Sequence, residues 1–189
     1  VGSATFIIVA VDAFRLEGAP DPYDPRSGTG GYPLMAESIL PVYYSPGSTE
    51  GREKLSLAGL GDVEFVAFRL RPGDDISCLN LYAPSQPRVL GAPARFLESG
   101  RFHFQASLAE SAEERANPWL LLTRPSPEGA IPAAVAANSL TYVLHRKLGE
   151  EFLLPVAGGR AIRFRLVAAL TDTVFQRELI ISEENFLRL

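Results

Sequence analysis

The last part of the chain, from residue 131 to the C-terminus, constrains the fold most. It reads IPAAVAANSLTYVLHRKLGEEFLLPVAGGRAIRFRLVAALTDTVFQRELIISEENFLRL. An apolar strand, a short amphipathic helix, a hairpin, a second apolar strand and the start of a helix follow one another. A β-α-β piece mixed with an antiparallel hairpin is typical of α+β domains. The segment therefore predicts an α+β fold, a mixed sheet with short helices, and it contains no plausible catalytic constellation.

The amphipathic helix is predicted from four aliphatic residues that share one helical face. They are Leu140, Val143, Leu144 and Leu148. Asn138 or Ser139 is expected to cap the start of this helix, and Gly149 is expected to end it in the left-handed conformation.

The hairpin is expected to join strands at residues 151–156 and 160–170 through a turn at Gly158-Gly159. In the second strand, apolar positions alternate with Arg163 and Arg165, so we expect a sheet with one solvated face. A terminal helix is expected to begin at Ser182 and to be cut by the end of the chain.

The other elements are predicted from β-formers, caps and turn residues. Residues 15–31 form a linker or loop. Strands are expected at Tyr32–Tyr44 (interrupted by Pro41), Val63–Leu70, Ile76–Tyr82 and Trp119–Thr123. Helices are expected at Ser48–Leu57 and Leu108–Ala116, the latter stopped by Pro118. The segments PSQP and GAP are expected to be irregular, and Gly100 to mark a turn between extended pieces.

The N-terminal stretch from Ala4 to Phe14 is almost wholly apolar and has two interpretations. As a helix it would be about 17 Å long, whereas a bilayer core is about 30 Å thick. It is therefore either a buried first strand or the outer end of a membrane helix. Composition alone favours the strand.

Charge and cysteine content narrow the class of protein. The net charge is −4 and the 18 Lys and Arg residues form no dense run, which argues against a nucleic-acid partner. The single cysteine, Cys78, excludes an internal disulfide and is typical of a small buried side chain.

Catalytic and metal sites are not expected. The two histidines, His103 and His145, stand apart, whereas a zinc site needs three or four neighbouring ligands. No G-x-S-x-G elbow selects a nucleophilic serine. Asp74 and Asp75 follow Pro72-Gly73 and are better interpreted as turn residues than as cation ligands. We therefore expect a protein that is not an enzyme and has no cofactor or metal.

Several segments, in this order, resemble the extracytoplasmic domain of ABC-transporter permeases of the FtsX/MacB type. They are FRLRPGDDISCLNLY, RFLESGRFHF, IPAAVAANSLTYVLHRKLGEEFLL, AIRFRLVAAL and RELIISEENFLRL, and the resemblance covers roughly Tyr32 to Leu189. It implies a two-lobed domain over residues 32–189, with a porter-like lobe and a small lobe inserted at about 71–117. It also favours the end of a membrane helix, or a strand directly after it, for residues 1–14.

The resemblance implies a transmitting role on the extracytoplasmic (periplasmic) side of the bacterial cytoplasmic membrane, within an integral membrane protein. The ATPase would be a separate subunit or domain, reached through the membrane part. Further implied partners are a second permease, an extracytoplasmic protein, and a lipid or peptide cargo. The interaction candidates are Arg71, Asp74, Asp75, Asn80 and Tyr82.

The alternative function is a secreted or periplasmic carbohydrate-binding domain. In that case Trp119 and exposed tyrosines would contact a sugar ring.

Overall fold

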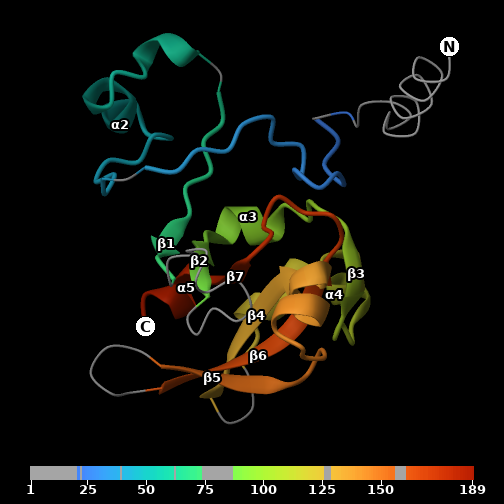
Figure 1. The fold of residues 1–189 in the computed structure, drawn as a ribbon. Coiled ribbons are helices and arrows are strands. Elements are labelled where there is room, and N and C mark those ends of the chain that lie inside the picture. Colours follow the sequence, from blue (N-terminus) through green and yellow to red (C-terminus); the bar gives the residue numbers. More distant parts are fainter. Residues whose placement is uncertain are drawn as a thin grey trace, which may run out of the picture.

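A mixed seven-stranded sheet forms the centre of the computed structural model (Figure 1), which confirms the predicted α+β class. The structure describes residues 21, 23–38, 40–61, 63–73, 87–125, 129–155 and 161–189. The strands are β1 (Arg69–Arg71), β2 (Arg88–Ala92), β3 (Phe104–Ser107), β4 (Ile131–Ala136), β5 (Glu151–Pro155), β6 (Ala161–Leu170) and β7 (Glu178–Ser182). Their order is β1-β2-β7-β4-β6-β3, and β5 also pairs with β6.

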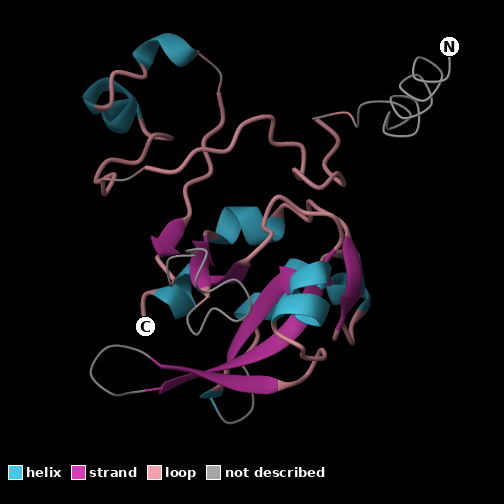
Figure 2. Cartoon of the chain, in the orientation of Figure 1, coloured by secondary structure: helices cyan, strands magenta, loops and turns pink. Residues whose placement is uncertain are grey.

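The helices are short, and most of them lie beside the sheet, whereas those of residues 49–60 lie away from it (Figure 1 and Figure 2). They are α2 (Thr49–Lys54), α3 (Ala94–Glu98), α4 (Ala112–Ala116) and α5 (Glu183–Phe186), with 3₁₀-helices η1 (Ala58–Leu60) and η2 (Pro118–Thr123) and the π-helix η4 (Ser139–Val143). Helices α2, α4 and α5 confirm predicted helices. Each begins after a serine that accepts a hydrogen bond from the backbone of its first turn: Ser48, Ser111 and Ser182.

The predicted hairpin is confirmed by the antiparallel pairing of β5 with β6. Its turn, residues 156–160, lies outside the described residues. Strand β4 runs parallel to β6 along one edge, whereas β5 and β3 follow one another along the other edge of β6. Strands β2 and β3, from the region 71–117, join this same sheet.

Both faces of the central strands are buried, each against its own apolar cluster. In β7, Ile180 belongs to one cluster, whereas Leu179 and Ile181 belong to the other. The expectation of one solvated face holds only at the start of β6, where Arg163 is exposed. From Val167 to Leu170 every residue of β6 is buried, because segments on both sides cover the sheet.

Residues of the predicted amphipathic helix cover one of these faces. Leu140, Leu144 and Leu148 pack against the second cluster, and Gly149 has a φ of +89°. The first turns form a π-helix, in which the hydroxyl of Ser139 donates to the carbonyl of Gln176 instead of capping the helix.

Three predictions of strands are wrong in whole or in part. Residues 119–123 form the 3₁₀-helix η2 instead, with Trp119, Leu121 and Leu122 buried, because the Asn117 side chain caps it and Pro118 suits a first turn. Residues 32–38 and 40–44 form no strand. Of residues 63–70, only the last two lie in a strand, β1.

The segment RVLGA was missed as a strand. It forms β2, which pairs in parallel with β7 and is largely buried. Gly100 does mark a turn, with a φ of +63°, but the piece before it is helix α3 rather than extended chain.

Candidate interaction surface

Residues 33–64 run away from the core after Tyr32 and return to it before Val66, and we call them the arm. Figure 1 shows this part of the chain running past α3 and carrying α2 away from the sheet. The core resumes with Val66 and Phe68, which pack against the first cluster, and then with β1. The arm is therefore an excursion between two fixed points on the core.

The first fixed point depends on Arg101. The indole N–H of the fully buried Trp119 donates to the Arg101 carbonyl at 2.7 Å. The Arg101 guanidinium donates to the carbonyl of Gly30 at 2.9 Å and lies 4.9 Å from the centre of the Tyr32 ring. Burial raises the pKa of Tyr32 above its usual value, and the positive charge of Arg101 partly opposes this rise.

Phe102 completes the first fixed point. Its N–H donates to the carbonyl of Pro25 at 2.7 Å, and its φ is +71°, which is unusual for a bulky residue. The ring packs 5.9 Å from Trp119 and 5.4 Å from Phe175, measured between ring centres. Packing and the hydrogen bond therefore hold this strained backbone in place.

Two further arginines of the core hold the arm, one at its second fixed point and one within it. Arg95 of α3 donates to the carbonyl of Phe65. Arg88 of β2 forms an ion pair with Glu37, at 2.7 Å between Nη2 and Oε2. Arg101, Arg95 and Arg88 thus attach the arm at its start, at its end and within it.

Inside the arm, Arg52 of α2 binds the chain on both sides of its helix, between Pro46 and Val63. We call this part of the arm the hook. The Arg52 guanidinium donates to the carbonyls of Pro46, Gly61 and Val63, and it lies 5.7 Å from the centre of the Phe65 ring. Three backbone acceptors bound by one charged side chain give the hook a defined shape without a large apolar core.

Large apolar side chains are exposed mainly in the arm and in the segment that leads into it. Among the described residues, twelve large apolar side chains are exposed, and nine of them lie between residues 23 and 63. They are Tyr23, Leu34, Met35, Leu40, Val42, Tyr43, Tyr44, Leu60 and Val63. Single exposed apolar residues are ordinary, but a concentration on one segment indicates a contact surface.

Of the predicted interaction residues, the structure describes only Arg71. It ends β1, is half-buried and pairs in register with Val89 of β2. The other four lie outside the described residues: Asp74, Asp75, Asn80 and Tyr82. Cys78 and the apolar stretch 4–14 also lie outside them. Both histidines are exposed. Trp119 has no exposed surface, so its predicted contact with a sugar ring is wrong.

The apolar residues of the arm were not predicted as a surface. The segment 32–44 was assigned to a strand because it is rich in β-formers. Pro33 and Pro41, together with the lack of strict alternation between apolar and polar residues, were the signals for an unpaired segment.

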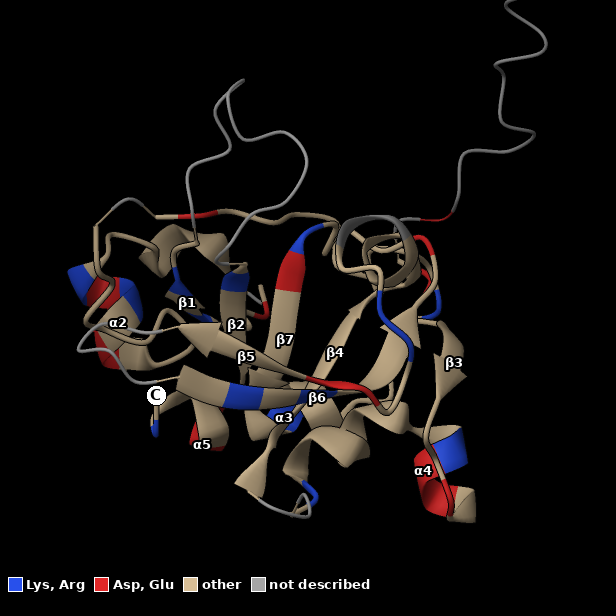
Figure 3. Cartoon of the chain, turned by 60° about the horizontal axis from the view of Figure 1, so that its bottom comes forward, with Lys and Arg blue, Asp and Glu red and all other residues tan. Residues whose placement is uncertain are grey.

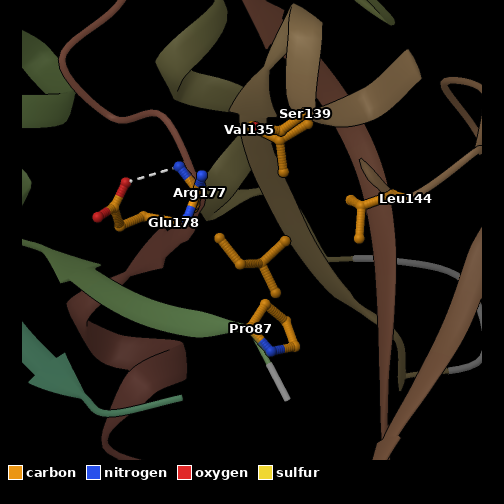
Figure 4. A pocket seen from close by; sticks show the side chains of 7 residues that line it. Pro87, Val135, Ser139, Leu144, Arg177 and Glu178 are labelled. Carbon is orange, nitrogen blue, oxygen red and sulfur yellow. Dashed lines mark hydrogen bonds between the residues drawn. The ribbon is translucent and has the colours of Figure 1, made fainter. Parts of the chain in front are cut away.

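The hollows in the described surface are small or open. The first, shown in Figure 4, holds about 20 Å³, which is room for one water molecule. It lies between Val135, Leu144 and the start of β7, where the N–H of Arg177 donates to the Glu178 carboxylate. The second, about 300 Å³, is open to solvent on the arm beside Thr49, Arg52 and Glu53.

No family model, curated protein or solved structure matches this chain. In the described part of the chain, no three His, Cys, Asp or Glu side chains gather as a metal site would require. Within those same residues, no helix has the length and apolar character needed to cross a membrane.

Proposed function

We propose that this chain is the extracytoplasmic domain of an ABC-transporter permease subunit of the FtsX/MacB type. It transmits ATP-driven movement of the membrane part and contacts a partner protein or cargo, while ATP is hydrolysed by a separate subunit or domain. The order of the resembling segments between Tyr32 and Leu189 supports the family. The arm supports the contact-making role.

The observation that carries this proposal is an exposed apolar arm fixed to a stiff core. A densely packed body transmits movement with little deformation, because packed interiors have low compressibility. Strands β2, β4, β6 and β7 are buried on both faces at their centres, so they form such a body. The contacts of Arg88, Arg95 and Arg101 would make the arm follow its movement.

Two points are tested in cells that express the full-length protein: whether it is in the membrane, and on which side of the membrane this domain lies. We would replace Tyr43, which is 87% exposed, by cysteine in a Cys78→Ser background. A maleimide that does not cross membranes should label Tyr43→Cys in intact cells. A cysteine at the fully buried Val89 serves as the matched control and should stay unlabelled. Recovery of the protein in the soluble cell fraction would refute the proposal.

Coupling to ATP hydrolysis is tested on the detergent-solubilised full-length protein. It should purify with an ABC-type ATPase, and the complex should hydrolyse ATP. Purification without any ATPase, in a detergent that keeps other permease complexes intact, would count against the transport assignment.

A further inference from the structure

We infer that the arm binds an apolar protein surface that is rimmed by lysine and arginine side chains. The inference names the class of partner for the contact-making role proposed above. It rests on that role and not on transport.

The apolar part of the inference comes from six side chains in eleven residues. Their exposed fractions are 88% for Leu34, 62% for Met35, 75% for Leu40, 51% for Val42, 87% for Tyr43 and 44% for Tyr44. Burying such side chains in a partner removes apolar surface from water, which favours binding before the entropy of association is subtracted. Tyr and Met are enriched at protein interfaces, and Tyr is frequent among the residues that contribute most to binding.

The net negative charge of the arm favours a partner whose rim is positively charged. Residues 33–64 contain five acidic and two basic side chains, so three of the four net negative charges of the chain lie here. Arg52, one of the two cations, is directed to backbone carbonyls within the hook, and Glu37, one of the five anions, is paired with Arg88 of β2. The rest of the chain is nearly neutral, with 17 acidic and 16 basic residues. Figure 3 shows residues of both signs on α2 as well as on α4, so the excess of negative charge in the arm lies outside α2.

The same charge argues against a lipid surface as the occupant. Bacterial and other biological membranes present anionic headgroups, which attract basic segments and repel acidic ones. An arm with a net charge of −3 would therefore approach a cationic protein surface more readily than a bilayer.

The backbone of the arm is restricted at two prolines and at one ion pair with the core. Pro33 and Pro41 restrict its backbone, and Arg88 fixes Glu37. The described residues of 33–44 pair with no strand of the core. Binding would therefore cost less conformational entropy than it would for a free peptide, while the side chains stay accessible.

The probes for the test are two synthetic amphipathic peptides with the same leucine face. One carries lysine on its polar face and the other carries glutamate. By calorimetry the lysine peptide should bind this chain at least about tenfold more tightly. Its affinity should fall severalfold as salt shortens the Debye length from about 10 Å to about 3 Å. In NMR spectra the largest shifts should fall on residues 34–44.

Matched variants separate the arm from the rest of the surface. Leu34→Ser with Tyr43→Ser should weaken binding of the lysine peptide at least tenfold and leave the melting temperature unchanged, because both side chains are exposed. Leu153→Ser with Leu187→Ser removes two exposed apolar residues outside the arm, at 61% and 66% exposure, and should leave the affinity unchanged. Glu50→Gln with Glu53→Gln should reduce the preference for lysine over glutamate.

Three results would overturn the inference: equal affinity for both peptides, no effect of the Leu34 and Tyr43 substitutions, or an equal loss with the Leu153 and Leu187 variant. Vesicles of phosphatidylglycerol and phosphatidylcholine provide a further test. If they bind the chain, and Leu34→Ser with Tyr43→Ser abolishes that binding, the occupant is a lipid surface instead. A soluble full-length protein would refute the transport proposal yet leave the peptide result standing.

Discussion

The ring of Phe102 fills the space that a side chain at residue 30 would need. A Cβ on Gly30 would lie 2.2 Å from Cε2 of Phe102, and Gly30 itself has a φ of +63°. Glycine is therefore required twice here, for its backbone conformation and for the close approach of the ring. This contact is the point at which the start of the arm meets the aromatic cluster of the core.

Gly30→Ala should lower the free energy of unfolding by about 2 kcal/mol or more, because the left-handed backbone and the Phe102 ring both oppose a methyl group. The melting temperature should fall by about 5 °C in a scanning calorimeter. Gly59→Ala is the control, since no atom lies within 4 Å of its Cβ position. Equal melting temperatures for the two variants would show that the contact is not needed.

Gly91→Ala should destabilise the junction between β2 and α5. A Cβ on Gly91 would lie 2.8 Å from Cβ and Cγ of Phe186. We expect a loss of about 1–3 kcal/mol in urea unfolding. Phe186→Ala removes the contacts with the ring and leaves only the one with Cβ, so the double variant should be more stable than the sum of the two single effects predicts. Strict additivity would mean that the two residues do not interact.

Arg52→Ala should loosen the hook without unfolding the core. The variant loses the donors to the carbonyls of Pro46, Gly61 and Val63. Amide hydrogen exchange of Leu55 and Leu57 should become at least tenfold faster, whereas exchange within β6 should not change. Lys54→Ala, on the same helix, is the control and should leave all these rates as they are. Faster exchange in β6 would mean that the arm and the core unfold together.

Glu114 makes the stability of α4 depend on pH. Its carboxylate accepts hydrogen bonds from the N–H groups of Glu110 and Ser111 at 2.9 and 3.1 Å, and these bonds lower its pKa below 4.5. The Arg124 guanidinium, 3.5 Å away, acts in the same direction. Since the folded pKa is the lower one, the stabilisation is present above the unfolded pKa and is lost as pH falls through the folded pKa.

Glu114→Gln keeps the shape of the side chain without its charge. The variant should melt below the parent protein at about pH 7, and the difference should shrink as the pH falls to about 3. Melting curves followed by circular dichroism across this range provide the measurement. A difference that stays constant with pH would show that the carboxylate charge does not contribute.

The C-terminal part of the fold was predictable because its signals are local. The alternation in β6, the cap at Ser182 and the glycine at 149 each specify an element within a few residues. Strand β2 lacks such signals, since it is short, contains Gly91 and is flanked by Pro87 and Pro93. It is a strand because β7 pairs with it, and that partner lies about ninety residues later in the chain.

Two segments with strong local strand signals form no strand in the described structure. Residues 119–123 and 32–44 are rich in β-formers, but Asn117 and Pro118 start a helical turn in the first segment, and the second finds no partner strand. The candidate surface could not be predicted for the same reason. The sequence shows that Leu34 and Tyr43 are apolar, whereas only the fold shows that nothing in the described core covers them.

The sheet is complete without the arm, because residues 33–64 supply none of its seven strands. Natural variation can therefore lengthen, shorten or rewrite this excursion at little cost to folding, as long as Tyr32 and Phe65 keep their places on the core. A lineage that carries this domain would acquire a new partner by changing the arm alone. Among its relatives, divergence should then be greatest in the arm and least around Gly30, Phe102 and Trp119.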